Sequence, residues 1–193
     1  MWARPWLDGL LAVLIDLSVD AIAIRVGLWH WNIGLHEGWF GVPSGNLCAW
    51  MWVAFWYSAV TRLVRARIAR GEPGWHRWLV PTVAYTGLFA SLYTIGITGA
   101  ALGLKTQNQK LWYFAVHLVV FLAVVTIAWR HRRPDASSVL RSFVWNRWLI
   151  HAVFFAVLVC TGMWRREPAL IAVSLGSMAI EATIFMRVEP ARS

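Results

Sequence analysis

Six apolar stretches, each long enough to cross a lipid bilayer as a helix, recur along the 193 residues of the chain. A membrane-spanning helix needs about 20 mostly apolar residues. The stretches lie at roughly 6–27, 46–66, 78–100, 110–129, 145–164 and 168–187. They predict an all-α fold, a polytopic integral membrane bundle of about six transmembrane helices. Pro168 suits the first turn of the last helix, after a tight hairpin.

Composition supports lipid as the solvent around most of the chain. Of its residues, 59% are hydrophobic and 14% are charged, whereas a soluble domain carries roughly a quarter charged residues. The chain contains no linker-like segment and no repeat of fixed period. We therefore expect residues 1–193 to form a single transmembrane domain.

The net charge of +9 indicates contact with a membrane rather than with nucleic acid. The arginines flank the apolar stretches instead of forming one face, which is typical of topology signals and of contact with anionic lipid headgroups. Thirteen of the 18 lysines and arginines fall on one side of the predicted membrane. Both termini are therefore predicted to be cytoplasmic, and we expect the protein in a bacterial inner (cytoplasmic) membrane.

Tryptophan is unusually frequent, with 15 residues. Many lie at the predicted membrane interfaces, where an aromatic belt explains them. A denser group surrounds the first loop and the second predicted helix: Trp29, Trp31, Trp39, Trp50, Trp52 and Trp56. This group is compatible with the belt or with an aromatic-lined pocket for a long apolar ligand.

Asp16 and Asp20 are the main candidates for chemistry. They lie one helical turn apart and share a face of the first predicted helix. Ionisable groups inside membrane helices are costly and usually face the bundle interior. Two neighbouring carboxylates in a medium of low dielectric resist joint ionisation, so one could stay protonated and serve as a general acid. The alternative is a structural pair, satisfied by hydroxyls, Arg25 or water.

Other ionisable residues suggest weaker sites. Glu181 shares a face of the sixth predicted helix with Ser174 and Ser177 and could join a polar centre or bind a helix end. His117 and His151 lie inside predicted helices, where each is expected to be a hydrogen-bonded core residue or, alternatively, a pigment ligand.

A metal site is not expected. The spacing of His30, His36 and Glu37 in the first outer loop is not a recognised metal-binding spacing. Microbial rhodopsin is excluded because Lys105 and Lys110, the only lysines, lie at helix edges.

One segment of about 35 residues resembles the membrane carotenoid hydratase family, typified by bisanhydrobacterioruberin hydratase. The family shows an Asp-x-x-x-Asp helix, a Gly-x-Trp-x-Trp exit, an aromatic-aromatic-Gly-Val-Pro loop and an Asn before the next helix. The matching residues are Asp16 and Asp20, then Gly27, Trp29 and Trp31, then Trp39, Phe40, Gly41, Val42 and Pro43, then Asn46 and Trp50.

The resemblance implies addition of water to a terminal C=C of an acyclic carotenoid. Asp16 or Asp20 would protonate the alkene, and the other would orient the water. Trp29, Trp31 or Trp50 would stabilise the carbocation, and Trp39 and Asn46 belong to the implied substrate-binding set. The apolar polyene would enter from the lipid, and no metal or organic cofactor would be needed.

Two other classes of function remain open. The chain could be a non-catalytic membrane subunit that binds carotenoid or another pigment, or that scaffolds a larger photosynthetic or energy-transducing complex. A small transporter using Asp16 and Asp20 as a proton relay is less favoured, because no broken-helix pair or inverted repeat marks a substrate site.

Overall fold

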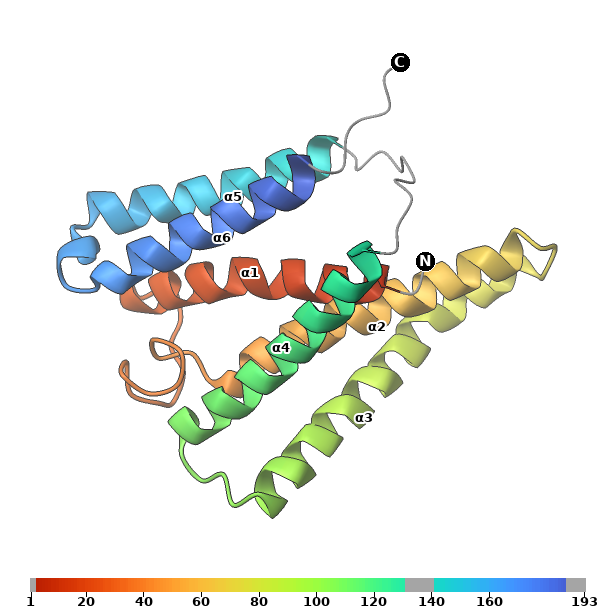
Figure 1. Cartoon of the computed structure of the whole chain (residues 1–193), viewed down its shortest axis with the longest axis horizontal. Helices are drawn as coiled ribbons and strands as arrows, with labels where there is room; N and C mark the ends of the chain where they lie inside the picture. The colour runs from red at the N-terminus through yellow and green to blue at the C-terminus, as the bar shows by residue number, and fades with distance from the viewer. Residues whose placement is uncertain (1–2, 131–140, 187–193) are drawn as a thin grey trace. The chain divides into compact units, whose positions relative to one another are not determined.

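The computed structural model describes residues 3–130 and 141–186. Within them six α-helices follow one another (Figure 1): α1 (Arg4–Arg25), α2 (Ser44–Ile68), α3 (Val80–Ala101), α4 (Gln107–Arg130), α5 (Arg141–Cys160) and α6 (Pro168–Met186). Two short 3₁₀ helices, η1 (Gly74–Leu79) and η2 (Met163–Arg165), precede α3 and α6. The predicted all-α class is confirmed in the described part of the chain.

Four of the described helical segments are long and apolar enough to cross a membrane: Ser44–Ile68, Gly74–Ala101, Gln107–Ala128 and Pro168–Phe185. Only 17–22% of each apolar window is buried inside the protein. Most of these apolar side chains therefore point outward, as expected for helices surrounded by lipid rather than by water. The chain thus has the helices of an integral membrane protein.

The other two helices are less clear membrane spans. α1 carries Asp8, Asp16 and Asp20 together with arginines at both ends. α5 contributes a shorter apolar stretch, Val144–Cys160. Neither is counted among the four long apolar helices, so the predicted number of about six spans remains a prediction.

Helix boundaries agree with the sequence analysis within a few residues, with two corrections. The fifth helix was predicted to continue to residue 164 but ends at Cys160, because Gly162 adopts a left-handed conformation with φ 68°. The first helix ends at Arg25 rather than residue 27. Pro168 opens α6 as predicted. Residue 187, the predicted end of the last span, lies outside the described residues.

The chain forms two compact units, and α1 contributes to both. The first unit comprises residues 1–13 and 43–130. Within it α2 packs against α3, α4 and η1. Four aromatic rings pack edge to face where α1, α2 and α4 meet, with centroids 4.6–6.3 Å apart. These rings are Trp6, Trp52, Phe55 and Phe121, so part of the predicted tryptophan group serves as core.

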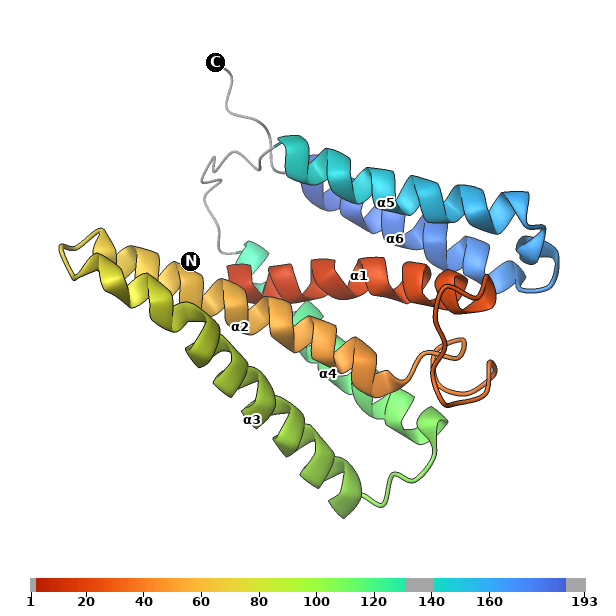
Figure 2. The same ribbon diagram turned by 180° about the vertical axis from the view of Figure 1, so that it is seen from behind.

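The second unit comprises residues 14–42 and 131–193. α5 and α6 run side by side as an antiparallel hairpin, visible from both directions in Figures 1 and 2. Ile22 of α1, Leu158 of α5 and Leu170 of α6 are fully buried. The single domain expected for residues 1–193 remains a prediction.

Close packing in the first unit gives a testable prediction at Gly87 of α3. A methyl group added there would lie 2.4–2.7 Å from three indole atoms of Trp56 on α2. The indole is held in place because its Nε1 donates to Ser91 Oγ at 2.9 Å. We expect Gly87→Ala to destabilise the protein by about 1–3 kcal/mol, measured as a lower thermal midpoint in detergent.

Gly96→Ala on the same helix is the matched control. An added methyl group at Gly96 meets nothing within 4 Å. This variant should be neutral or slightly stabilising, since alanine favours a helix over glycine by about 1 kcal/mol. Equal midpoints for the two variants would contradict tight packing of α3 on α2.

Candidate functional site

The two predicted catalytic carboxyl groups lie together on α1. Asp16 and Asp20 are 8% and 7% exposed, although both side chains are acids. Their carboxyl groups are close enough to interact with each other, both electrostatically and through a side-chain hydrogen bond. A hydrogen bond between two carboxyl groups requires a proton on one of them. The pair can therefore hold a proton in a largely dry part of the second unit.

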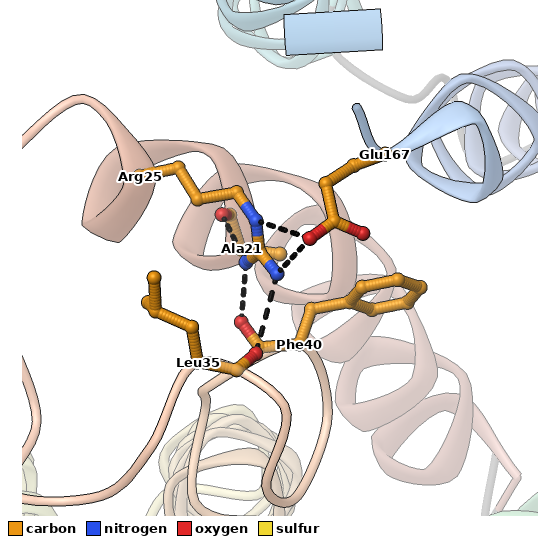
Figure 3. Close-up of polar contacts among 5 residues, drawn as sticks. All are labelled: Ala21, Arg25, Leu35, Phe40 and Glu167. Carbon is orange, nitrogen blue, oxygen red and sulfur yellow. Dashed lines mark hydrogen bonds and ion pairs between the residues drawn. The ribbon is translucent and has the colours of Figure 1, made fainter. Parts of the chain in front are cut away.

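The loop that follows α1 is fixed by Arg25 (Figure 3). The Arg25 side chain is 6% exposed, and its Nη2 lies 2.9 Å from Oε1 of Glu167, just before α6. Its guanidinium also donates to the carbonyl oxygens of Leu35 and Phe40 in the loop and of Ala21 in α1. A guanidinium has five donors in a rigid fork, which suits this role. Arg25 thus binds the loop, α1 and the start of α6 together.

Phe40 is the loop residue most constrained by this arrangement. Its backbone has φ 51°, a left-handed conformation that is uncommon for a residue other than glycine. The carbonyl of Phe40 accepts a hydrogen bond from Arg25, and the guanidinium carbon lies 5.6 Å from the centroid of its ring. The contacts with Arg25 offset the cost of this backbone conformation.

The predicted tryptophans of the substrate site have different surroundings. Trp39 is half-buried, and its indole Nε1 donates at 2.7 Å to the carbonyl of Leu17, the α1 residue that directly follows Asp16. Trp29 and Trp31 are 39% and 36% exposed in the loop. Trp39 therefore helps to seat the loop on α1, whereas Trp29 and Trp31 present part of their rings outward.

Asn46 and Trp50, the remaining predicted substrate-binding residues, lie on α2 and belong to the first unit. Asn46 is half-buried, and Trp50 is 49% exposed. In the second unit the structure therefore brings together Asp16, Asp20 and Trp39.

Arg25 gives a prediction for the loop. In Arg25→Ala, residues 26–42 should lose the contacts with α1 and α6 that Arg25 provides, and the hydrogen bond from Trp39 to Leu17 would remain. Hydrogen bonds to a charged group are worth about 1.5–3 kcal/mol, so amide hydrogen exchange in the loop should become about tenfold to a hundredfold faster. Exchange measured by mass spectrometry tests this.

The control is Arg166→Ala, which removes the same charge from an exposed position beside Glu167. This variant should leave exchange in residues 26–42 unchanged. Equal rates of amide exchange in residues 26–42 for Arg25→Ala and Arg166→Ala would show that Arg25 does not hold the loop in place.

A second buried polar cluster joins all three helices of this unit. Arg147 of α5 donates to both carboxylate oxygens of Glu181 on α6, from Nε to Oε2 at 3.1 Å and from Nη2 to Oε1. His151, one turn after Arg147, places Nε2 3.2 Å from Glu181 Oε1 and Nδ1 3.5 Å from Ser18 Oγ on α1. All four residues are at most 7% exposed. We call them the Glu181 network.

Ser18 gives this network its connection to α1. The Ser18 hydroxyl lies 3.5 Å from Nδ1 of His151 and donates to the Ile15 carbonyl at 3.2 Å. The network therefore links α1, α5 and α6 through polar side chains that are shielded from solvent.

Two serines extend this polar face of α6. Ser174 and Ser177 share the face of Glu181 and are 2% and 4% exposed. Ser174 Oγ has no hydrogen-bond partner among the described residues. Of the two roles left open for Glu181, joining a polar centre is the one that the structure describes.

Sequence reasoning missed how these residues combine. It treated His151 as a hydrogen-bonded core residue or a pigment ligand, without naming its partners, and counted Arg147 only as a basic residue flanking a span. A signal was present: Arg147 and His151 are four residues apart on α5, while Ser174, Ser177 and Glu181 form a matching stripe on α6. Two polar stripes on consecutive apolar helices predict that the helices face each other through those stripes.

The other histidines singled out in the sequence lie outside the Glu181 network. His117 of α4 is half-buried, and its Nδ1 lies 2.9 Å from the Tyr113 carbonyl one turn earlier. Within residues 3–130 and 141–186, no group of three or more His, Cys, Asp or Glu residues could hold a metal ion. The loop residues His30, His36 and Glu37 therefore form no such group.

Comparisons with known proteins give no relative for this chain: no family model, no curated protein and no solved structure matches it.

Proposed function

We propose that the chain is a carotenoid-hydratase-like enzyme of the bacterial inner membrane, with six spans that include α1 and α5 and with both termini in the cytoplasm. The bias of lysines and arginines toward one side supports this orientation. The arginines at 132, 133, 187 and 192, which contribute to the bias, lie outside the described residues. An even number of spans agrees with termini on one side.

The observation that carries the proposed activity is the buried pair of Asp16 and Asp20. Burying two acids side by side is costly, and such groups inside membrane helices are usually functional. A carboxylic acid kept neutral by a dry environment and a neighbouring carboxyl is a suitable proton donor to a weakly basic carbon.

The reaction follows from the chemistry of the pair. The protonated carboxyl group gives its proton to the less substituted carbon of the terminal C=C of an acyclic carotenoid. The π electrons form the new C–H bond and leave a tertiary carbocation. Water adds to this cation, and the remaining carboxylate takes a proton from the bound water to give a tertiary alcohol. The proton lost from one carboxyl group is thus regained by the pair.

A non-catalytic pigment-binding subunit is the second candidate. It is favoured by the outward exposure of Trp29, Trp31 and Trp50, which are 39%, 36% and 49% exposed. Exposed indoles at a membrane protein's surface suit contact with a long apolar polyene or with a partner in a larger membrane complex.

One experiment separates the two candidates. The chain is expressed in a bacterial host that makes acyclic carotenoids, and pigments from the cells and from the purified protein are weighed by mass spectrometry. The hydratase predicts a new pigment heavier by one or two waters. Unchanged pigment bound to the purified protein would instead support the binding subunit, and unchanged pigment with none bound would refute both.

A further inference from the structure

A cavity of about 470 Å³ opens between α2, η1 and α3 at the arginine-rich end of the first unit. Its apolar wall comprises Val64, Ile68, Val80 and Pro81. Val80 and Val64 also belong to the small core between these helices, together with Val60 and Ala84. The apolar wall of the cavity is therefore continuous with the packed core between α2 and α3.

Part of the cavity lining is cationic. Arg65 of α2 and Arg77 of η1 both line the cavity. Two neighbouring arginines have acidic partners, Arg62 with Asp8 at 3.0 Å and Arg67 with Glu72 at 4.0 Å. In the part of the chain that the structure describes, Arg65 and Arg77 form no ion pair. The cavity thus combines two guanidinium groups whose charge is not neutralised by a described carboxylate.

A third polar group points to a ligand. Thr61 lines the cavity one turn before Arg65, and its buried Oγ1 has no hydrogen-bond partner among the described residues. Threonines in the middle of membrane helices commonly donate to the carbonyl four residues earlier, as Thr94 and Thr98 do on α3. Because Oγ1 itself is enclosed, the Thr61 side chain must turn about its Cα–Cβ bond for the hydroxyl to donate to an anionic oxygen in the cavity.

The position of the cavity selects the kind of anion. The cavity lies where the apolar segments Ser44–Ile68 and Gly74–Ala101 meet their arginine-rich connection. Trp78 also lines it and is 73% exposed, with the Arg77 guanidinium carbon 5.5 Å from its ring centroid. Exposed tryptophans and arginines at the end of a span are typical of the headgroup level of a bilayer. A ligand here would place an anionic group among arginines and an apolar part against the valines.

We propose that this cavity binds the phosphate headgroup of an anionic membrane phospholipid. Arg65 and Arg77 hold the phosphate, Thr61 donates to one of its oxygens, and the first methylene groups of the acyl chains lie against Val64, Ile68 and Val80. Guanidinium groups recognise phosphate through paired hydrogen bonds, which gives the site its preference for phosphate over other anions. The proposed site gives a role in ligand binding to Thr61, Arg65 and Arg77, which all line the cavity.

The test uses the full-length protein purified in a zwitterionic detergent. Native mass spectrometry compares binding of phosphatidylglycerol with phosphatidylcholine. We expect the unmodified chain to prefer phosphatidylglycerol. Each arginine near a membrane surface contributes about 1 kcal/mol, so the double variant Arg65→Ala, Arg77→Ala should bind phosphatidylglycerol about 25-fold more weakly.

The matched control is the double variant Arg165→Ala, Arg166→Ala at the α5–α6 hairpin, which removes the same charge and also an arginine beside a tryptophan. It should retain the preference. Equal loss in both double variants would overturn the site, since net charge alone would then explain binding. Thr61→Val, which keeps the volume and the charge, should weaken phosphatidylglycerol binding without lowering the lipid-free thermal midpoint.

A competition experiment distinguishes a lipid from a soluble phosphate. Inorganic phosphate and glycerol phosphate at millimolar concentration should fail to displace phosphatidylglycerol, because they lack the acyl chains that contact the apolar wall. Displacement by either would overturn the proposal in favour of a soluble phosphate ligand. Equal binding of phosphatidylglycerol and phosphatidylcholine by the unmodified chain would overturn it altogether.

Discussion

Glu181→Ala is expected to lower the stability of the second unit by about 3–5 kcal/mol, because it leaves the Arg147 guanidinium buried without its carboxylate. Glu181 is fully buried and Arg147 is 7% exposed, so water cannot readily replace the lost partner. His151 loses the same carboxylate oxygen, 3.2 Å away. In a chain of this size such a loss corresponds to a thermal midpoint lower by roughly 10 °C. Thermal unfolding of the detergent-purified protein provides the measurement.

A double variant shows whether the Glu181 network serves stability alone. Replacing a buried ion pair by apolar residues of similar volume is often neutral or stabilising. We therefore expect Arg147→Met, Glu181→Met to recover most of the midpoint that Arg147→Met or Glu181→Met loses alone. A double variant as unstable as the sum of the single variants would show that the two charges do not act as a pair. A stable double variant that lacks activity would give the network a role in proton transfer.

Asp16→Asn and Asp20→Asn should each reduce formation of the hydrated carotenoid by at least about a hundredfold, the usual contribution of a general acid. Asparagine keeps the shape of aspartate but can neither hold the shared proton nor accept one from water. Because the side chains are nearly isosteric, the thermal midpoint should change little. Pigment mass spectrometry gives the product ratio, and the thermal midpoint reports whether the fold is retained.

Asp8→Asn is the matched control on the same helix. Asp8 pairs with Arg62 near the protein surface, and the two side chains are 34% and 41% exposed. Exposed ion pairs contribute little to stability, so this variant should form product at the normal level. Normal product from both Asp16→Asn and Asp20→Asn, with the same enzyme level, would remove the carboxyl pair from the mechanism.

The helical architecture was predictable because it depends on local composition. The second apolar stretch, expected at 46–66, is the helix Ser44–Ile68, and the third, expected at 78–100, belongs to Gly74–Ala101. Hydropathy placed the end of the fifth helix too late in the sequence, because Met163 and Trp164 are apolar yet lie beyond the turn at Gly162. Hydropathy records which residues prefer lipid and does not detect a left-handed residue that ends a helix.

The pairing of polar residues was not predictable to the same degree. The shared face of Asp16 and Asp20 follows from helical periodicity alone. The Glu181 network depends on the rotation of α5 and α6 about their axes, and on contacts between residues 34 positions apart in sequence, as for Arg147 and Glu181. The role of Arg25 similarly depends on Glu167, a residue 142 positions away. An arginine near the end of a span gives the same sequence signal whether it contacts lipid, a loop or a buried acid.

The division of α1 between two units has a consequence for biosynthesis. The first unit has all its segments once residue 130 has been made, whereas the second needs residues 14–42 and everything after 131. The chain grows by more than a hundred residues between Arg25 and Arg141, which takes roughly 6–23 s at about 5–20 residues per second. During that interval Ser18 has no access to His151, and Arg25 has none to Glu167. The polar residues of α1 therefore lack their partners on α5 and α6 until the last two helices have been synthesised.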